Sequence, residues 1–277
     1  MSRIAALLTV HNRREATLRS LDALFGAALP QGCALEVFLT DDGSTDGTAV
    51  AVAARFPQVR VLHGDGELYW NRGMINSWRA AAAQADHDFY LWLNDDTFLF
   101  RDALTELLEC SARAQDKAVI VGSTRSEQDG TMTYGGYGPR GLLPPDGAMQ
   151  RCRMFNGNVV LAPREVFRRV GMLDPHFRHA MGDFDYGLRA ARLGVEAFTT
   201  TRYSGLCERH DRLPVWCLPE TPLCGRLRSL YLPLGCPPCE FFRFDRRHNG
   251  LRKALIHWFT IHLRAVSPGL CAKLKRV

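Results

Sequence analysis

Short apolar runs alternate with amphipathic segments through the first 125 residues of the chain. Residues 4–10 form a continuous apolar run, which is typical of a buried parallel strand. Residues 15–25 place their leucines on one face of a helix. The same alternation predicts further strands at 35–40, 59–63, 88–93 and 118–122, and helices at 48–56, 70–85 and 103–114. Repeated strand–helix units indicate an α/β fold with a mainly parallel sheet, in which ligands bind at the carboxyl ends of the strands.

Glycine and proline interrupt this alternation after Ser123. Residues 130–147 contain six glycines and three prolines, which predicts a hairpin and a loop rather than a core element. The pattern then predicts a strand at 158–161, a helix at 163–170 with proline in its first turn, a helix at 183–193 ended by Gly194, and a β-rich run at 195–200. No internal repeat or low-complexity segment appears.

Charge is distributed unevenly along the 277 residues, although the formal net charge is only +6. Residues 226–277 hold eleven Lys or Arg against two acids, a net of +9, whereas the preceding 225 residues hold 24 basic and 27 acidic groups, a net of −3. We therefore expect an α/β domain at 1–225 and a basic helical extension at 226–277. The overall excess is too small for a dedicated nucleic-acid binder, so no nucleic-acid partner is expected.

The basic extension calls for an anionic partner. Residues 251–264 combine apolar residues at helical spacing with a tryptophan, which suits an interfacial helix on an anionic membrane surface. A helix packed on the main domain with solvated arginines explains the same pattern, and periodicity does not separate the two. Since neither a spanning segment of about 18 apolar residues nor a signal peptide is apparent, we expect a cytoplasmic protein, peripheral at the inner face of the membrane if the extension binds there.

Nine cysteines are expected to be reduced in such a compartment. Five of them lie close together in the sequence: Cys207, Cys217, Cys224, Cys236 and Cys239. A structural zinc usually needs two close pairs of ligands, and here only the last two cysteines form one. The pattern therefore favours small apolar thiols over a zinc site.

Three acidic clusters follow predicted strands or begin a predicted helix. Residues 41–47 follow the second strand, 94–97 follow the fourth, and 182–186 begin a late helix. Any one of them also fits a turn with a helix cap, because Asp, Gly and Ser are favoured in both. For the first cluster taken alone, the turn is the better interpretation.

The second cluster indicates chemistry more strongly. Asp95 and Asp96 are adjacent carboxylates at the end of a buried strand, and such a pair is costly unless a cation neutralises it. Oxygen ligands suit Mg²⁺ or Mn²⁺, which commonly share their coordination with substrate phosphates. A metal held there could stabilise a departing diphosphate. The third cluster offers a carboxylate, Asp183, at a helix start where it could take a proton from a hydroxyl.

Six segments together resemble a known family. They are residues 9–13, 40–48, 66–73, 93–97, 156–158 and 182–190. In order and spacing they resemble the family 2 glycosyltransferases, inverting enzymes of the GT-A fold, over residues 3–210. Within this family, the sequence resembles the bacterial polysaccharide and rhamnosyl-type transferases. The resemblance implies a Rossmann-like sheet, a nucleotide-diphosphate sugar as donor, and a glycan or lipid-linked acceptor.

The resemblance also implies a role for each matched position. Asp183 corresponds to the catalytic base, and Asp95 and Asp96 to a motif for Mg²⁺ or Mn²⁺, with Asp96 the more direct ligand. Asp42 is implied to accept from the ring N–H of uracil or thymine, so UDP- and dTDP-sugars both fit. Further donor contacts are implied at Val10, His11, Asn12, Arg13, Asn71, Arg72, Gly73, Asn94 and Asp95, and acceptor contacts at Asn156, Gly157, Asp185 and Tyr186.

Two departures from the family pattern are visible. The family commonly has Glu-Asp where this chain has Gly182-Asp183, so the base is retained while a neighbouring acceptor contact is missing. The family often supplies a further metal ligand, a histidine, after the late strand. His210 is the candidate here, and Cys207 is the second choice.

Other classes of protein remain as alternatives. A non-catalytic nucleotide-sugar-binding protein would need no base, and the presence of Asp42, Asp95, Asp96 and Asp183 together argues against it. A dinucleotide-dependent oxidoreductase would show Gly-x-Gly-x-x-Gly after the first strand, where this chain has residues 11–14 without glycine. A nucleotidyltransferase would typically show a glycine-rich loop at the same place.

Overall fold

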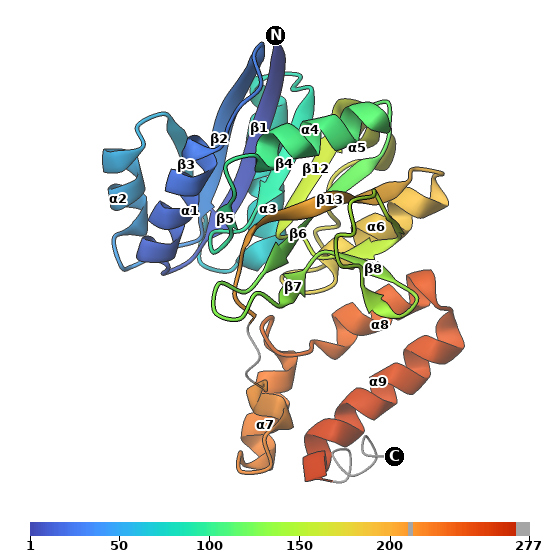
Figure 1. Ribbon diagram of the computed structural model, residues 1–277. Helices are drawn as coiled ribbons and strands as arrows, with labels where there is room; N and C mark the ends of the chain where they lie inside the picture. Colours follow the sequence, from blue (N-terminus) through green and yellow to red (C-terminus); the bar gives the residue numbers. More distant parts are fainter. Residues whose placement is uncertain (210–212, 270–277) are drawn as a thin grey trace. The chain divides into compact units, whose positions relative to one another are not determined.

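The computed structural model describes residues 1–209 and 213–269 (Figure 1). By its internal contacts the chain forms two compact units. Unit 1 comprises Met1–Pro175 and Asp183–Arg209, and unit 2 comprises His176–Gly182 and the chain after Arg209. No helix among the described residues is both long enough and apolar enough to cross a bilayer.

The described residues of unit 1 form a ten-stranded sheet. Eight strands follow one another in the order β10 (Arg151–Cys152), β13 (Ala197–Leu206), β6 (Val119–Arg125), β12 (Val159–Pro163), β4 (Phe89–Leu93), β1 (Ser2–Val10), β2 (Cys33–Asp41) and β3 (Val59–His63). In addition, β5 (Phe98–Leu99) pairs with β13 and β7 (Met132–Tyr134) pairs with β6. The pairs among β4, β1, β2 and β3 are parallel, and β12 is antiparallel to both of its neighbours. The predicted α/β fold with a mainly parallel sheet is confirmed.

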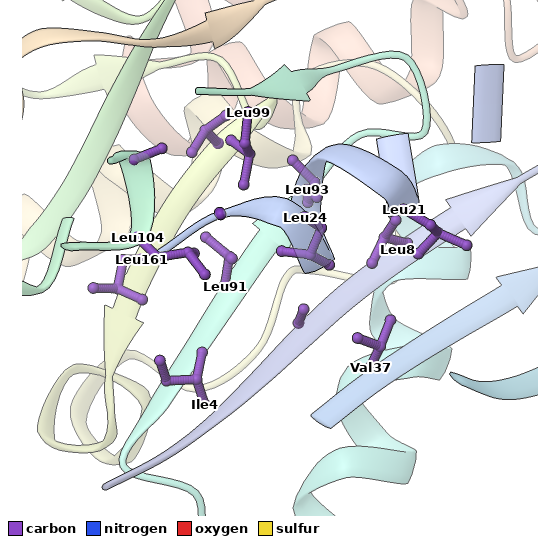
Figure 2. Packing of buried hydrophobic residues seen from close by; sticks show 14 of the residues in the cluster. Ile4, Leu8, Leu21, Leu24, Val37, Leu91, Leu93, Leu99, Leu104 and Leu161 are labelled. Carbon is purple, nitrogen blue, oxygen red and sulfur yellow. The ribbon is translucent and has the colours of Figure 1, made fainter. Parts of the chain in front are cut away.

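Alternate residues of β1 enter two different apolar cores because successive side chains of a strand point to opposite faces. Ile4 and Leu8 belong to the core covered by α1 (Arg14–Gly26), α2 (Thr48–Arg55) and α4 (Ala103–Arg113), which Figure 2 shows from close by. Ala5 and Leu7 belong to the core covered by α3 (Tyr69–Gln84), α5 (Arg164–Val170) and α6 (Gly182–Arg192). Because helices cover both faces of the sheet, its strands consist of continuous apolar runs.

The glycine-rich segment forms the predicted hairpin. Strands β8 (Gly136–Gly138) and β9 (Gly141–Leu142) pair antiparallel, and β11 (Met154–Phe155) adds to β8 to form a small second sheet. Gly136 is required at this position, because a Cβ there would lie 2.7 Å from a methyl carbon of Thr199. The small sheet thus packs close against the large one.

Unit 2 is helical in its described residues. It contains a short 3-10 turn, η1 (Val215–Cys217), and the helices α7 (Leu223–Tyr231), α8 (Pro238–His248) and α9 (Leu251–Val266). The predicted helix at 251–264 is therefore present. Trp216, Leu230 and Ile261 share one apolar core, so the segment before 226 packs with the basic helices. For this reason the compact units divide after Arg209, whereas the sequence places the boundary at 225/226.

Arg226 joins the two ends of this helical unit. Its buried guanidinium donates to the carbonyl oxygens of Ala265 and Val266 at 2.6 and 3.1 Å, at the carboxyl end of α9. A cation at this end also interacts favourably with the helix dipole.

Cys236 is buried in the apolar core of unit 2. Within the described ranges, no three His, Cys, Asp or Glu side chains lie closely enough together to hold a metal ion.

Candidate functional site

Three loops meet at the carboxyl ends of β1, β2 and β4, which are neighbours in the sheet. The backbone N–H of Asp42 donates to the carbonyl of Val10 at 2.8 Å, and Nδ1 of His11 lies 2.6 Å from the carbonyl oxygen of Asp42. The predicted positions after β1, β2 and β4 are therefore brought to one edge of the sheet, as expected for parallel strands.

Asn12 organises the loop that follows β2. Its Oδ1 accepts from the backbone N–H of Thr45 at 2.7 Å, and its own N–H donates to Oγ of Ser44 at 2.9 Å. Asn12 has a φ of 52°, a left-handed conformation that Asn adopts more readily than most residues. An open pocket of about 400 Å³ lies against these loops, with Asn12, Arg13 and Asp46 among its lining residues.

Asp42 is buried and binds backbone amides with both of its carboxylate oxygens. Oδ1 accepts from the N–H of Gly66 at 2.9 Å, and Oδ2 accepts from that of Tyr69 at 2.8 Å. A Cβ on Gly64 would lie 2.5 Å from Oδ1 of Asp42, so only glycine fits there. Asp42 therefore ties the loop before α3 to the end of β2. Its contact with a nucleotide base stays a prediction.

Asp95 and Asp96 face the guanidinium of Arg13. Nη2 of Arg13 lies 2.7 Å from Oδ2 of Asp96, and Nη1 lies 3.6 Å from Oδ1 of Asp95. Burial raises the pKa of Asp95 to about 7; Arg13 acts to lower that pKa, and the charge of Asp96 acts to raise it further. The pair is thus a desolvated anionic centre that one cation already partly neutralises.

This carboxylate pair fits a divalent metal ion with two protein ligands. Mg²⁺ is commonly bound by one or two carboxylates, with waters and substrate phosphates completing its coordination. Cys207 is buried beside the pair, with its Sγ 3.7 Å from Oδ1 of Asp96, but a thiol is a soft ligand that suits Mg²⁺ and Mn²⁺ poorly. The predicted third ligand, His210, lies outside the described residues. The geometry therefore supports Asp95 and Asp96, with Arg13 as the group that a metal would displace.

Trp70 connects the carboxylate pair to the predicted base, although the sequence did not single it out. Its Nε1–H donates to Oδ1 of Asn94 at 2.7 Å, immediately before the pair. Its ring lies against Gly157, where a Cβ would be 2.5 Å from Cη2 of Trp70. The N–H of Gly157 in turn donates to Oδ2 of Asp183 at 3.0 Å. The available signal was an aromatic residue inside the 66–73 segment at the start of α3.

Asp183 lies in the first turn of α6 and accepts two backbone hydrogen bonds. Besides that from Gly157, its Oδ1 accepts from the N–H of Phe184 at 2.8 Å. Burial raises the pKa of Asp183 to about 6 even though both hydrogen bonds act to lower it. A carboxyl group with such a pKa is ionised at neutral pH and is a stronger base than an exposed aspartate. The predicted role as a base is compatible with this environment.

Two predicted acceptor-binding residues, Asp185 and Tyr186, lie in the core. Asp185 is fully buried and forms an ion pair with Nε of Arg189 at 2.8 Å, one turn along α6. Tyr186 is also fully buried, with its ring against Trp78 and Trp92. Both side chains point into the core, because they lie on the inner face of α6. They support the helix in this structure, and their predicted acceptor contacts stay predictions.

The segment at the start of α3 is mainly structural. Asn71 is buried and donates from Nδ2 to the carbonyl of Asp174 at 2.9 Å, and Gly73 is required because a Cβ would lie 2.8 Å from Cβ of Thr9. Both residues are packing positions in this structure, and their predicted donor contacts stay predictions. Arg72 is partly exposed and donates from Nε to the carbonyl of Pro175 at 2.9 Å.

Asn156 also binds within the protein. Its backbone N–H donates to the carbonyl of Gly135 at 3.0 Å, and its Oδ1 lies 3.4 Å from the backbone nitrogen of Gly135. These contacts join the small sheet to the loop that carries Gly157. Asn156 is half-buried, so its predicted acceptor contact stays a prediction.

Replacing Gly157 with Ala is expected to lower the free energy of unfolding by about 1–3 kcal/mol, the usual cost of overpacking. The new methyl group would overlap the Trp70 ring and break its hydrogen bond to Asn94. Gly26→Ala is the matched control, because nothing lies within 4 Å of a Cβ at that position. Urea unfolding measures both, and equal stability of the two variants would contradict the close contact.

Comparison with known proteins agrees with this geometry. Residues 6–177 match the sequence model of the family described as "Glycosyl transferase family 2". The match contains the loops after β1, β2 and β4 and the segment that carries Gly157. No curated protein sequence matches the chain.

Solved structures share the fold at low sequence identity. One is a mannosyltransferase from Pyrobaculum calidifontis in complex with GDP-Man and Mn²⁺, at 15% identity and a TM-score of 0.56, covering 97% of this chain and 86% of that one. Another is S. aureus TarS 1-349 in complex with UDP, at 13% identity and a TM-score of 0.58, covering 96% and 81%. The fold of this chain is accordingly the GT-A fold.

Proposed function

The chain belongs to glycosyl transferase family 2, and we propose that it is an inverting enzyme with Asp183 as its base. The donor is a UDP- or dTDP-sugar, and the acceptor is a hydroxyl of a glycan or of a lipid-linked glycan. One observation carries the proposal. The carboxylate pair Asp95–Asp96 and the separate carboxylate of Asp183 are joined through Trp70, whose neighbours are Asn94 on one side and Gly157 on the other.

The carboxylate pair suits the leaving diphosphate of a displacement reaction, and Asp183 suits the attacking hydroxyl. A diphosphate departs from one face of the anomeric carbon, and the attacking hydroxyl arrives at the other. Asp95 and Asp96 would hold Mg²⁺ or Mn²⁺, which, when bound, supplies positive charge for the departing diphosphate. Arg13, already beside the pair, offers a guanidinium to the same phosphates. A single displacement of this kind inverts the anomeric configuration.

The base is supported by what surrounds it. Asp183 is held by the N–H groups of Gly157 and Phe184, so its carboxylate is fixed in position before an acceptor binds. Its pKa of about 6 keeps it deprotonated at neutral pH. It would accept the proton of the attacking hydroxyl while the new glycosidic bond forms. A retaining double displacement would instead need a carboxylate nucleophile at the anomeric carbon.

The alternative is a nucleotide-sugar-binding protein that lacks catalysis. Such a protein needs the loops after β1 and β2 but has no use for a desolvated carboxylate at Asp183. A panel of nucleotide sugars, tested for binding and for slow donor hydrolysis with and without Mn²⁺, separates the two. Hydrolysis or transfer supports the enzyme, and binding without any turnover on all donors and acceptors supports the alternative.

Asp42→Ala is expected to weaken UDP and dTDP binding alike, by roughly 10–100-fold, since a hydrogen bond to a charged group contributes about 1.5–3 kcal/mol. The same change frees the Gly66 and Tyr69 amides, so the loop before α3 should loosen as well. Calorimetry with each diphosphate measures the affinity.

Asp65→Ala is the matched control for this change. Asp65 is an exposed carboxylate of the same loop that accepts from the N–H of Glu67, at 2.9 Å. Its removal should leave both diphosphates bound as in the unchanged protein. Wild-type affinity in Asp42→Ala would reduce Asp42 to a turn residue.

A further inference from the structure

Helix α9 carries an apolar face that the described residues of unit 2 leave exposed. Its inner face buries Ala254, Ile261 and Ala265. A second set of apolar side chains, here called the outer stripe, is 36–62% exposed and consists of Leu251, Leu255, Ile256, Phe259, Leu263 and Val266. At about 100° per residue, these positions occupy an arc of roughly 140° beside the buried face. Six large apolar side chains on one exposed arc indicate an interaction surface.

Positive charge accompanies the outer stripe. Within Leu251–Val266 there are three cations, Arg252, Lys253 and Arg264, and no acid. The two acids of α7–α9 are bound within unit 2: Arg178 pairs with Glu240 at 2.6 Å, and Asp245 accepts from Asn249 at 2.7 Å. The surface around the stripe is therefore cationic, without compensating carboxylates on α9.

The apolar surface continues onto the end of α7. The hydroxyl of Tyr231 lies 2.7 Å from Nε2 of His262, which brings the half-exposed Tyr231 beside α9. The next residues along the chain, Leu232 and Leu234, are 51% and 65% exposed. Trp258 is 40% exposed and packs against His262 with ring centroids 4.1 Å apart. Tyr and Trp at the border of an apolar stripe are typical of side chains that sit at a membrane–water interface.

We propose that α9 docks the protein on an anionic membrane, with its outer stripe among the acyl chains and Arg252 and Lys253 at the lipid phosphates, whereas Arg264 lies over the ring of Trp216 in the core of unit 2. A helix that combines an apolar arc of Leu and Phe with cations, Arg252 within the arc and Lys253 beyond its edge, and that is too short and too polar to span, has the composition of an interfacial helix. A second copy of the chain is a poorer occupant, because it would bring three further cations against the first three. This proposal does not depend on the glycosyl-transfer reaction.

Vesicle co-sedimentation of the full chain tests the docking. We expect binding to vesicles of phosphatidylcholine mixed with phosphatidylglycerol, little binding to phosphatidylcholine alone, and release by salt. Arg252→Gln combined with Lys253→Gln should weaken binding about 25-fold, since each cation near such a surface contributes roughly five-fold. Equal binding to neutral and anionic vesicles, or no binding to either, would overturn the proposal.

A charge placed in the stripe tests which face is inserted. Phe259→Glu should abolish binding to the anionic vesicles, while Val50→Glu, at a 75% exposed apolar position on α2, should leave it unchanged. If both variants sedimented with the vesicles as strongly as the unchanged chain, the outer stripe would not be the membrane-binding face. A concentration-dependent dimer that Phe259→Glu dissociates would assign the face to a second copy instead.

One readout needs no substitution in the stripe. If Phe259→Glu unfolds unit 2, the unchanged chain still reports insertion through quenching of its tryptophan fluorescence by lipids brominated on their acyl chains. Of the five tryptophans, Trp258 is 40% exposed and Trp70 is partly buried, whereas Trp78, Trp92 and Trp216 are buried. Quenching in anionic vesicles that Trp258→Phe removes supports insertion of α9, and quenching that persists in Trp258→Phe, or unquenched emission from membrane-bound protein, would contradict it.

Discussion

Asp183→Asn is expected to lower the turnover number by roughly 10²–10⁴-fold, the usual contribution of a general base. The amide has the size of the carboxylate and can still accept one of the two backbone hydrogen bonds, from Gly157 or Phe184. It cannot take a proton from the acceptor hydroxyl at neutral pH. Affinity for the donor should change little, because the proposed partner of Asp183 is the acceptor hydroxyl and not the nucleotide. Single-turnover rates and diphosphate calorimetry measure the two quantities.

Asp129→Asn is a suitable control for that substitution. Asp129 is an exposed carboxylate that also accepts a backbone hydrogen bond, from Thr131 at 2.9 Å, so the chemical change is the same. Its turnover should equal that of the unchanged protein. Near-normal turnover in Asp183→Asn would require another base, whereas retention of the anomeric configuration in the product, observed by NMR, would overturn the single displacement itself.

The pKa of Asp183 also predicts a pH profile. In the folded protein this pKa is raised to about 6, so the carboxylate that acts as base is present above this pH and is lost as the pH falls through it. With metal and donor saturating, so that Asp95 stays ionised, the turnover number kcat should therefore decline below about pH 6, approaching a tenfold loss per pH unit, the slope for a single ionisation. An acid limb that persists unchanged in the residual activity of Asp183→Asn would assign the ionisation to another group.

The pattern of apolar residues predicts the parallel half of the sheet well, because β1, β2, β3 and β4 are buried on both faces and joined by amphipathic helices. It does not reveal that β12 is antiparallel. A strand covered on both faces is continuously apolar in either direction, and the direction depends on the intervening small sheet. Within the predicted helical extension, the separate bounds of α7 and α8 could not be predicted, since prolines and glycines divide that segment into short stretches whose apolar residues pack in a core shared with η1 and α9.

The sequence likewise reveals some residues of the candidate site and not others. Asp95, Asp96 and Asp183 could be found because acidic residues after a strand or at a helix start are visible in the sequence. Trp70 could not, because its importance arises from contact with Gly157, 87 positions away in the chain. The burial of Tyr186 is visible in the sequence, because Tyr186 and Ala190 are four residues apart and apolar, which places both on the inner face of α6.

Asp96→Asn is expected to abolish the metal-dependent part of donor binding. Losing a side chain that only orients a metal ligand typically costs 10–100-fold in affinity, and losing a direct carboxylate ligand should cost more. Titration of UDP or dTDP in the presence and absence of Mn²⁺ measures the difference. The unchanged protein should bind more tightly with the ion, and Asp96→Asn should bind equally weakly in both conditions while its thermal unfolding stays cooperative.

Arg13→Gln separates the metal from the ion pair, because Asp96→Asn also removes the partner of Arg13, 2.7 Å away. Arg13→Gln breaks the same ion pair yet keeps both carboxylates. If Asp95 and Asp96 hold the metal, this variant loses a competing cation, so Mn²⁺ alone should bind it more tightly than it binds the unchanged protein. Its affinity for the diphosphate without metal should fall, since one guanidinium is gone. Equal loss of Mn²⁺ dependence in Arg13→Gln and Asp96→Asn would instead mean that the ion pair organises the loop, and the carboxylates would no longer be assigned as ligands.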